Sequence, residues 1–340
     1  MKRIAYTGPF TVAVESIPPV VNPPGNTLIK VAYAGICGSD MNIYHGVHPR
    51  AKAPLTMGHE FSGTVVEGHP VLKPGTPVTV YPLISCGVCE SCTTGNPHVC
   101  STLKLIGIDT DGGMAEYVSV PHDKVIELPR DVSLLAGSYA EPLAVGVHAI
   151  HRSSYKPGDR TVIFGAGPIG MSVALCLREF GASSVVLIEG NPYRLSVAQD
   201  LGFGTIDPTK ESIPDKLTQL TGRGDADILF DCAAHPSVQK DILGITRIRG
   251  TMVVVGSYKK SEEVDLLKIE FKELTVVGTR VYRREDFPIA VRIIQRNQKT
   301  VERLITPFNP DGASKVFADL RGGTNVIKAT FAFGETFNHA

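Results

Sequence analysis

The sequence lacks an excess of either charge. Lysine and arginine together number 34, aspartate and glutamate also number 34, and no block of basic residues stands out. Proteins that bind nucleic acid or anionic membrane surfaces usually carry a basic patch or a positive net charge. The charge balance therefore argues against both partners and favours a small-molecule substrate.

The sequence also lacks a long apolar run. No stretch approaches the roughly 20 apolar residues that a membrane span needs. The segment from Met1 to Tyr6 leads into a strand-like pattern without the apolar core of a secretory signal. Internal repeats and low-complexity segments are absent as well. We therefore expect a cytoplasmic globular protein.

The length of 340 residues exceeds what one hydrophobic core usually supports, so two domains are expected. Up to about residue 150, short apolar runs such as 27–32 and 77–80 alternate with glycine and proline, which is typical of an all-β or barrel-like domain. The tail after residue 298 resembles this first segment. We therefore predict one split domain, residues 1–150 with residues 298–340.

The central segment, residues 151–297, has a different rhythm. Apolar strands alternate with glycine turns and helices, a pattern that predicts a parallel sheet and an α/β domain inserted into the first one. Strands are expected at residues 161–164, 184–188, 226–230, 251–255 and 274–277, and helices at residues 169–180, 237–247 and 285–296.

Four cysteines form a C-x2-C-x2-C-x7-C run. They are Cys86, Cys89, Cys92 and Cys100. Four thiolates on one loop can enclose a tetrahedral zinc ion and leave no position for substrate, which describes a structural site. A disulfide cluster is the alternative, but Cys176 and Cys232 suggest no disulfide framework. An iron–sulfur cluster also uses four thiolates, although its known spacings differ from this one.

A second set of metal-binding residue types comes from distant stretches. Cys37, His59 and Glu60 offer one sulfur, one imidazole and one carboxylate. Such a mixed set suits a zinc ion that keeps a vacancy for water or an alcohol. We therefore predict a catalytic zinc site in addition to the structural one.

A glycine motif follows the strand expected at 161–164 and opens the next helix. It runs Gly165-Ala166-Gly167-Pro168-Ile169-Gly170. Glu189 lies 19 positions after Gly170, at the end of the following strand. This context predicts a dinucleotide site in which the glycines permit the turn, the approach of the pyrophosphate and close helix packing.

The identity of the dinucleotide depends on Glu189. Its carboxylate is expected to accept hydrogen bonds from the ribose hydroxyls and to repel a 2′-phosphate, which favours NAD over NADP. Arg194 either stacks on the adenine or forms a salt bridge on a solvated helix face. Val255 and Gly256, at the end of the strand expected at 251–255, are also assigned to the cofactor site.

With these motifs in place, the sequence resembles the zinc-dependent medium-chain dehydrogenases, and within them the polyol and sugar-acid branch around sorbitol dehydrogenase. The four-cysteine loop and the glycine motif both match. Three further segments carry the resemblance: Gly35–Asp40, Gly58–Gly63 and Glu141–His148. The resemblance spans nearly the whole chain. It implies a Rossmann domain inserted into a GroES-like β-barrel domain, and a homodimer or homotetramer.

The resemblance also assigns the catalytic zinc to Cys37 and His59. Glu60 and Glu141 are then nearby carboxylates that ligate directly or through water. Without the family, the Glu-Pro pair at Glu141 would be interpreted as a helix start. Ser39 could take the substrate proton and pass it towards solvent, although a serine there could equally be a turn residue.

One position departs from the family. A histidine commonly stands two positions after the aspartate of the Cys-Gly-Ser-Asp segment, as a relay or substrate-contact group, and this chain has Asn42. Asparagine cannot titrate near pH 7, so a relay must end elsewhere. His45 could replace the missing group, but a surface histidine is the favoured interpretation, and His48 is less informative still.

These features predict a zinc-dependent enzyme that oxidises a secondary hydroxyl of a polyol or sugar acid with NAD. Arg280, within the Thr279–Arg284 segment, could bind a carboxylate or phosphate, which would favour galactonate or idonate over sorbitol or xylitol. The alternative is a solvated or interface arginine. Threonine and butanediol dehydrogenases share the same machinery. A non-catalytic scaffold would have no use for the catalytic residues, which are Cys37, Ser39, His59, Glu60 and Glu141. A zinc-ribbon nucleic-acid binder would need a basic surface, and the region Leu83–Gly113 is not basic.

Overall fold

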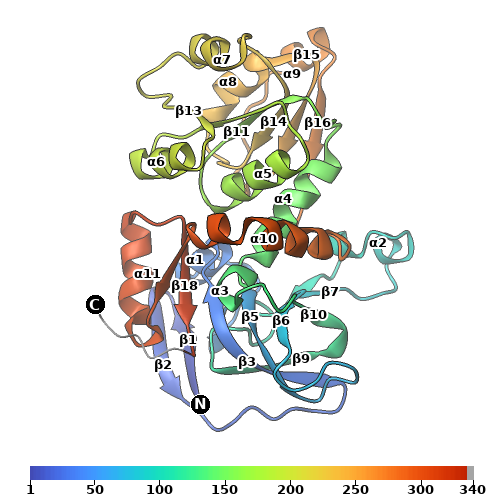
Figure 1. The fold of residues 1–340 in the computed structure, drawn as a ribbon, viewed down its shortest axis with the longest axis vertical. Coiled ribbons are helices and arrows are strands. Elements are labelled where there is room, and N and C mark those ends of the chain that lie inside the picture. The colour runs from blue at the N-terminus through green and yellow to red at the C-terminus, as the bar shows by residue number, and fades with distance from the viewer. Residues whose placement is uncertain (335–340) are drawn as a thin grey trace. The chain divides into compact units, whose positions relative to one another are not determined.

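A computed structural model describes residues 1–334 and divides the chain into two compact units (Figure 1). One unit comprises Met1–Glu141 and the chain from Val291 onward, and the other comprises Pro142–Ala290. The chain passes between the units within two helices, α4 (Ala140–Arg152) and α10 (Asp286–Glu302). The limits expected near residues 150 and 297 fall in these same helices.

The first unit is built around a seven-stranded sheet with the order β10-β6-β5-β3-β18-β17, in which β9 also pairs with β3. Its strands are β3 (Asn26–Gly35), β5 (Glu60–Glu67), β6 (Pro77–Val80), β9 (Tyr117–Pro121), β10 (Val125–Glu127), β17 (Ile305–Phe308) and β18 (Lys328–Ala332). Strand β18 runs antiparallel to β3, with Phe331 opposite Ala34. The tail of the chain thus joins the sheet begun by the N-terminal segment.

The remaining elements of this unit flank that sheet. A three-stranded sheet and a two-stranded ribbon contain β1 (Lys2–Gly8), β2 (Thr11–Ser16), β4 (Leu55–Thr56), β7 (Leu83–Ile84) and β8 (Lys104–Leu105). The helices are α1 (Gly38–Tyr44), α2 (Glu90–Thr93), α3 (Leu134–Gly137) and α11 (Ala313–Gly322), with 3₁₀ turns η1 (Pro97–Val99), η2 (His122–Lys124) and η3 (Pro310–Gly312). Helix α1 begins three residues after β3 ends, so Cys37 caps the helix and the Gly-Ser-Asp residues that follow it form the first turn of α1.

The second unit is a six-stranded parallel sheet with the order β13-β12-β11-β14-β15-β16. Its strands are β11 (Arg160–Phe164), β12 (Ser184–Ile188), β13 (Gly204–Ile206), β14 (Ala226–Asp231), β15 (Thr246–Val254) and β16 (Thr275–Gly278). Its other helices are α5 (Pro168–Glu179), α6 (Pro192–Asp200), α7 (Ile213–Thr221), α8 (Val238–Ile245) and α9 (Leu266–Phe271). This order is the Rossmann order 3-2-1-4-5-6, in which ligands bind where the order reverses. The predicted fold class is confirmed.

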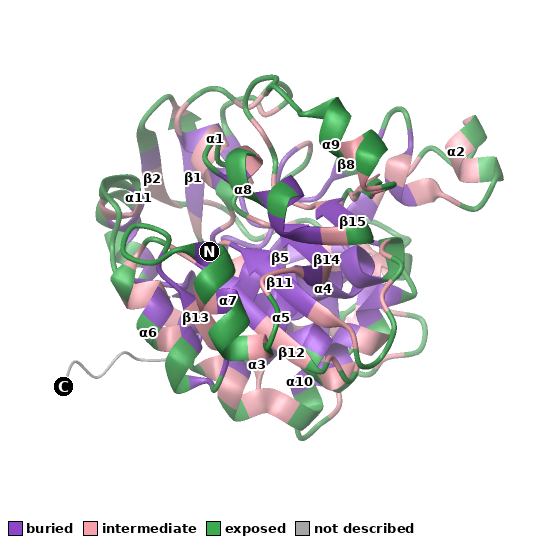
Figure 2. Ribbon diagram, turned by 90° about the horizontal axis from the view of Figure 1, so that it is seen from above, coloured by how far each residue is buried: buried purple, intermediate pink, exposed green. Residues whose placement is uncertain are grey.

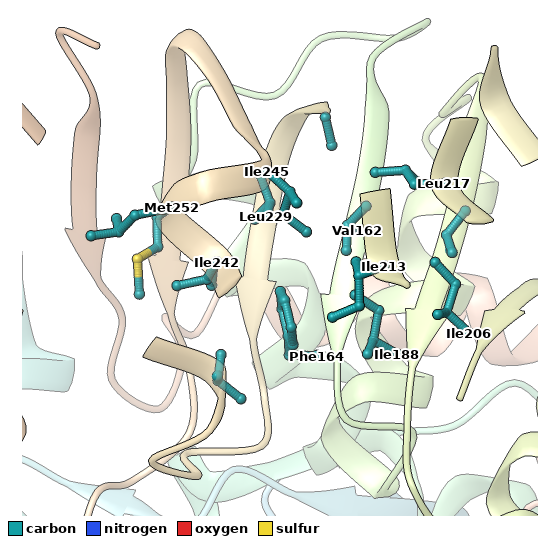
Figure 3. Close-up of a cluster of buried hydrophobic side chains, with 14 residues drawn as sticks. Val162, Phe164, Ile188, Ile206, Ile213, Leu217, Leu229, Ile242, Ile245 and Met252 are labelled. Atoms are coloured by element: carbon teal, nitrogen blue, oxygen red, sulfur yellow. The ribbon is translucent and has the colours of Figure 1, made fainter. Parts of the chain in front are cut away.

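One face of the parallel sheet buries a continuous apolar cluster (Figure 3). Val162, Phe164 and Leu229 from the strands pack with Leu217 of α7 and Ile242 of α8, and each is at most 2% exposed. Burying one such side chain contributes about 1.5–3 kcal/mol. The central strands β11 and β14 of this sheet are accordingly among the most buried segments of the chain (Figure 2).

Helix α8 ends earlier than its predicted limit at residue 247. Its last residue is Ile245, and strand β15 begins at Thr246. The Lys272 ammonium donates to the carbonyls of Leu243, Gly244 and Thr246 at 2.9, 2.6 and 2.8 Å. A cation at this end stabilises the terminal carbonyls of a helix and so favours termination there. The sequence pattern could not reveal this partner, because it lies beyond β15.

Candidate active site and metal centres

The four predicted cysteines converge in one loop between β7 and β8. Their sulfur atoms lie within 4.8 Å of one another. The Cys89–Cys92, Cys86–Cys92 and Cys89–Cys100 separations are 3.5, 3.9 and 3.9 Å. A tetrahedral ion with Zn–S bonds of about 2.3 Å places its sulfurs roughly 3.8 Å apart. The thiols therefore fit a single zinc ion, whereas a disulfide would need about 2.05 Å.

Backbone N–H groups point at these sulfurs. The amides of Cys86 and Cys89 donate to the sulfurs of Cys100 and Cys86, each at 3.3 Å. Hydrogen bonds from the backbone of Ser101 and Cys92 lower the pKa of the Cys89 thiol to about 5. Such donors stabilise the thiolate form that binds metal ions.

The second predicted set also converges. One ligand atom from each of Cys37, His59 and Glu60 lies within 4.8 Å of the others, and the two side chains from the 59–60 pair are buried. Cys37 precedes the first residue of α1, and Glu60 is the first residue of β5. Two strand ends of one sheet thus bring together ligand types that are far apart in the sequence.

Asp40 belongs to this site, although its role was not predicted from the sequence. The residue is fully buried in α1, and its Oδ2 accepts a hydrogen bond from the Cys37 amide at 2.8 Å. Its Oδ1 lies 3.9 Å from His59 Nδ1. Burial raises the pKa of Asp40. At the 3.9 Å separation, Asp40 Oδ1 and His59 Nδ1 make no hydrogen bond, so Asp40 acts on His59 through its negative charge. The signal available in the sequence was the aspartate of the Cys-Gly-Ser-Asp segment.

Lys328 is a second residue that sequence reasoning missed. Its side chain is only 3% exposed and forms an ion pair with Glu60. Its ammonium also donates to the Ile36 carbonyl at 3.0 Å. Burial alone would lower the pKa of Lys328, but the charges of Glu60 and Cys37 raise it. A single charged residue within the apolar run 326–331 was the available signal.

The charges around His59 show why this cluster fits a cation. Burial alone would lower the pKa of His59, but the interactions with Cys37, Asp40 and Glu141 raise it well above the ordinary value. Groups that stabilise an imidazolium stabilise a divalent cation in the same place. With sulfur, nitrogen and oxygen donors together, the residues match the donor types of a catalytic zinc site.

Glu141 interacts with this cluster but is not one of the three residues whose ligand atoms lie within 4.8 Å of one another. It is 6% exposed and occupies the first turn of α4. The atoms within 4.8 Å of one another come from Cys37, His59 and Glu60. The charge of Glu141 nevertheless raises the pKa of both His59 and Lys328. Its carboxylate therefore contributes to the negative potential of the site.

The candidate proton-transfer residues in and just after α1 have different surroundings. Ser39 Oγ is buried and has no hydrogen-bond partner among residues 1–334. A buried hydroxyl in that state can hydrogen-bond a ligand at no cost to an existing contact. The ring of His45 instead packs on Phe10, with centroids 5.5 Å apart. His48 Nδ1 accepts from the Arg50 amide at 3.3 Å.

The glycine motif has the geometry that its sequence predicted. Gly165 adopts a φ of 96°, and a methyl group at Gly170 would lie 1.8 Å from the Gly165 carbonyl oxygen. At Gly167 the nearest atom to such a methyl group is Arg194 Nη1 at 3.6 Å. The first and third glycines therefore serve the turn and the packing, while the second leaves open space at the N-terminus of α5.

The Glu189 carboxylate is anchored at the end of β12. Its Oε2 accepts from the Ala166 amide and its Oε1 from the Asn191 amide, both at 2.9 Å. Arg194 Nη1 lies 3.6 Å from Oε2, so Arg194 forms an ion pair with Glu189. Each carboxylate oxygen keeps further acceptor capacity, because it has about two lone-pair sites.

The carboxyl ends of β14 and β15 add a polar group that was not predicted. The Gly256 amide donates to the Asp231 carbonyl at 2.8 Å. The buried Asp231 carboxylate accepts from the Ala234 amide at 2.9 Å and from the Tyr258 hydroxyl at 2.5 Å. Val255 and Gly256 thus lie at the carboxyl ends of the parallel strands, where ligands bind in such folds. Arg280 follows the carboxyl end of β16, and the next residue, Val281, has a positive φ of 44°.

Comparisons with known proteins agree with this geometry. Residues 23–130 match the alcohol dehydrogenase GroES-like domain, and residues 168–296 match the zinc-binding dehydrogenase family. The 2-dehydro-3-deoxy-L-galactonate 5-dehydrogenase of Pseudoalteromonas atlantica is 36% identical over 310 residues, covering 90% of this chain and 91% of that protein.

Solved structures share the whole fold. The (2R,3R)-butanediol dehydrogenase of Bacillus subtilis has a TM-score of 0.89 at 30% identity, covering 97% of this chain and 99% of that one. An alcohol dehydrogenase of Escherichia coli CFT073 in complex with NADH has a TM-score of 0.89 at 26% identity, covering 98% of this chain and 99% of that one.

Within residues 1–334, no helix combines the length and apolar character required to traverse a bilayer.

Proposed function

The chain belongs to the zinc-binding dehydrogenase family, and we propose that it oxidises a secondary hydroxyl of a polyol or sugar acid to a ketone with NAD as the hydride acceptor. The observation that carries this proposal is the convergence of Cys37, His59 and Glu60 within 4.8 Å. A closed structural site would need four protein ligands, whereas this mixed set suits a metal that also binds a substrate.

The two metal centres have different tasks in this proposal. Cys86, Cys89, Cys92 and Cys100 would hold a structural zinc ion. Cys37 and His59 would hold the catalytic one, with Glu60 and Glu141 as carboxylates that ligate directly or through water. When bound, the catalytic zinc supplies Lewis acidity that lowers the pKa of the substrate hydroxyl. Asp40 adds a carboxylate 3.9 Å from His59 Nδ1, and its charge favours a cation at this site.

Ser39 moves the substrate proton in this proposal. Its buried Oγ has no partner among the described residues, so it is available to hydrogen-bond the substrate hydroxyl. The hydroxyl would pass the proton towards solvent. Asn42 cannot titrate near pH 7 and therefore takes no part as an acid or base. The packing of His45 against Phe10 supports a structural role for that histidine.

NAD is the proposed cofactor, and the nicotinamide supplies the hydride chemistry when bound. The N-terminus of α5 would receive the pyrophosphate, because the first amides of a helix have no intrahelical acceptor and the helix dipole is positive there. Glu189, held by two backbone amides, would accept the adenosine ribose hydroxyls and repel a 2′-phosphate. Val255 and Gly256 would form further cofactor contacts just after the carboxyl end of β15.

The substrate class is proposed from two observations. A relative with 36% identity is named for its action on a galactonate derivative, which is a sugar acid. Arg280 offers a guanidinium that could bind a substrate carboxylate in bidentate fashion. The similarity to a butanediol dehydrogenase keeps a small diol as the second candidate. L-Threonine is a third, because an L-threonine 3-dehydrogenase of Bacillus velezensis is 37% identical over 278 residues.

An absorbance screen at about 340 nm, the reduced nicotinamide band that reports hydride transfer, tests the proposal. Polyols, aldonates, 2,3-butanediol and threonine would each be supplied with NAD. We expect the highest kcat/KM for a polyol or an aldonate. A clear preference for butanediol or threonine would move the chain to the neighbouring substrate classes. Absence of NAD reduction with all of them would favour the scaffold alternative.

A homodimer or homotetramer is also proposed. Helix α9 is largely exposed (Figure 2). Its Leu266, Leu267 and Phe271 are 72%, 63% and 78% exposed. The neighbouring strand β16 is the last of the parallel sheet and exposes Val276 by 45%. An apolar sheet edge of this kind is a template for pairing with another chain. Light scattering should give two or four chain masses, and a concentration-independent monomer would contradict the proposal.

The state of the cysteines supports a cytoplasmic location. All seven are free thiols in the structure, and five of them belong to the two groups that could hold a metal ion. Thiolate metal sites require reduced cysteines, which the cytoplasm maintains. Fractionation of cells that express the protein would test this location directly.

A further inference from the structure

The ion pair between Lys328 and Glu60 crosses three adjacent strands. In strand β3, Gly35 lies opposite Glu60 of β5 on one side and opposite Thr330 of β18 on the other. Lys328 precedes Thr330 by two residues, so both side chains project from the same face of β18. The charged groups of Lys328 and Glu60 meet over the position of Gly35.

Gly35 makes this contact possible because it has no side chain. A methyl group there would lie 2.6 Å from Glu60 Oε2 and 3.2 Å from Lys328 Cε. Real side chains do not approach so closely, so any larger residue would displace the carboxylate. The backbone register and the missing side chain together define a place for the ion pair inside the sheet.

The Lys328 ammonium touches the metal site at two points. It pairs with the Glu60 carboxylate, and it donates to the carbonyl of Ile36, the residue before Cys37. The side chains of Lys328 and Glu60 are 3% and 1% exposed. A buried ammonium needs a counter-ion, because an unpaired charge in the interior is strongly unfavourable. The Glu60 carboxylate can therefore either pair with the Lys328 ammonium or ligate the metal, and these two interactions compete.

We propose that Lys328 is a positioning residue that holds the Glu60 carboxylate in this ion pair, so that Glu60 remains an exchangeable rather than a permanent ligand of the metal at Cys37 and His59. This inference rests on the proposed function, since a dehydrogenase must keep one metal position for its substrate. Any movement of Glu60 to the metal would strip Lys328 of its counter-ion, and this cost restrains the carboxylate.

The test measures zinc affinity rather than turnover. In the full-length Lys328→Met variant, Glu60 loses its restraint, and the more labile of the two zinc equivalents should be released to a chelator about tenfold more slowly or be bound about tenfold more tightly, on the scale of outer-shell effects. The Lys328→Arg variant keeps the charge and should match the wild type. The Met variant should also show a raised substrate KM.

A double-variant cycle separates positioning from a simple charge effect. If Glu60 is the ligand that tightens the site, the Lys328→Met/Glu60→Gln protein should bind zinc no more tightly than Glu60→Gln alone. Cobalt(II) substituted at this site should show a change in visible absorption with Lys328→Met, because the band intensity depends on coordination number. That change should be absent from the double variant.

Three results would overturn the proposal: unchanged zinc affinity in Lys328→Met, weaker affinity, or a tightening that persists in the double variant. If Lys328→Met does not fold, Lys328→Gln keeps a donor for the Ile36 carbonyl without the charge and carries the same expectations. The outcome is independent of the substrate screen. Failure of the wild type to reduce NAD would remove the proposed function, while the zinc measurements would still decide the role of Lys328.

Discussion

His148 Nδ1 lies 2.9 Å from Asp286 Oδ2, a buried contact that ties helix α4 to the first residue of helix α10. The other oxygen, Oδ1, receives His151 Nδ1 at 2.8 Å, and the Arg283 amide donates to Oδ2 at 2.7 Å. One carboxylate thus joins both helices through which the chain passes between its units. Its fully buried position makes it a determinant of stability.

Replacing Asp286 with alanine should therefore destabilise the protein by roughly 3 kcal/mol, because His148 and the Arg283 amide lose a buried partner. Urea unfolding would measure the loss. The matched control is His151→Ala, which removes a side chain that is 45% exposed and should cost less than about 1 kcal/mol. Equal losses in the two variants would show that the buried His148 contact has no special weight.

Asp227 should give the stability of the second unit a pH dependence in acid. Burial raises the pKa of Asp227, but hydrogen bonds from Arg160 and Arg247 outweigh it and lower the pKa from 3.8 to about 2. A carboxylate whose pKa falls on folding stabilises the native state above its unfolded pKa. This stabilisation is about 2 kcal/mol near neutrality and is lost as the pH falls through the window from about 4 to 2.

The measurement is the urea midpoint of wild type and Asp227→Asn at several pH values. The difference in unfolding free energy between the two proteins should be largest at pH 7 and should shrink by about half near pH 3. A difference that stays constant between these pH values would mean that the pKa of Asp227 is not lowered.

Replacing Glu189 with alanine should weaken NAD binding much more than NADP binding. The ribose hydrogen bonds are lost, and the repulsion towards a 2′-phosphate is relieved at the same time. Binding titrations with both dinucleotides would reveal a narrowed or inverted preference. Glu189→Gln is the matched control, since it removes the charge but keeps an acceptor for one backbone amide. A wild type that already prefers NADP would refute this role and direct attention to Arg194.

The Ser39→Ala variant should lose roughly 10²-fold or more in kcat, as expected when a positioned proton-transfer group is removed. Zinc content and NAD affinity should be unchanged, because the hydroxyl serves neither. The variant Asn42→His should shift the pH profile if no other group has taken over the relay. Near-normal turnover of Ser39→Ala at pH 7 would remove the serine from the mechanism and favour a proton path through Glu141.

Metal analysis should find two zinc equivalents per chain with different lability. The four-thiolate site is closed, whereas the site at Cys37 and His59 keeps an exchangeable position. Cys89→Ala should lose the tightly held equivalent and lower the unfolding temperature, while His59→Ala should lose the labile one. A single tightly held equivalent, or iron in place of zinc, would contradict the two-site interpretation.

The features that the sequence predicted correctly are the local ones. The glycine motif, the four-cysteine loop and the βαβ rhythm each arise within a short stretch, where spacing alone restricts the geometry. The position of Glu189 at the end of β12 follows from the same local pattern, because one helix and one strand separate it from Gly170, while its role towards the ribose stays a prediction. The donor types of Cys37, His59 and Glu60 predicted the second zinc site, and the family resemblance supported it, but their separation in sequence by itself implies no contact.

The tertiary structure alone decided the partners of the buried charges. Lys328 meets Glu60 only because β18 joins the sheet beside β3, and that register brings together strands from opposite ends of the chain. Asp286 meets His148 because two helices that are distant in sequence pack together. A buried charge must find a counter-charge or hydrogen-bond partner. Sequence can show that a charge lies in an apolar segment, but only the packing of remote elements determines which group neutralises it.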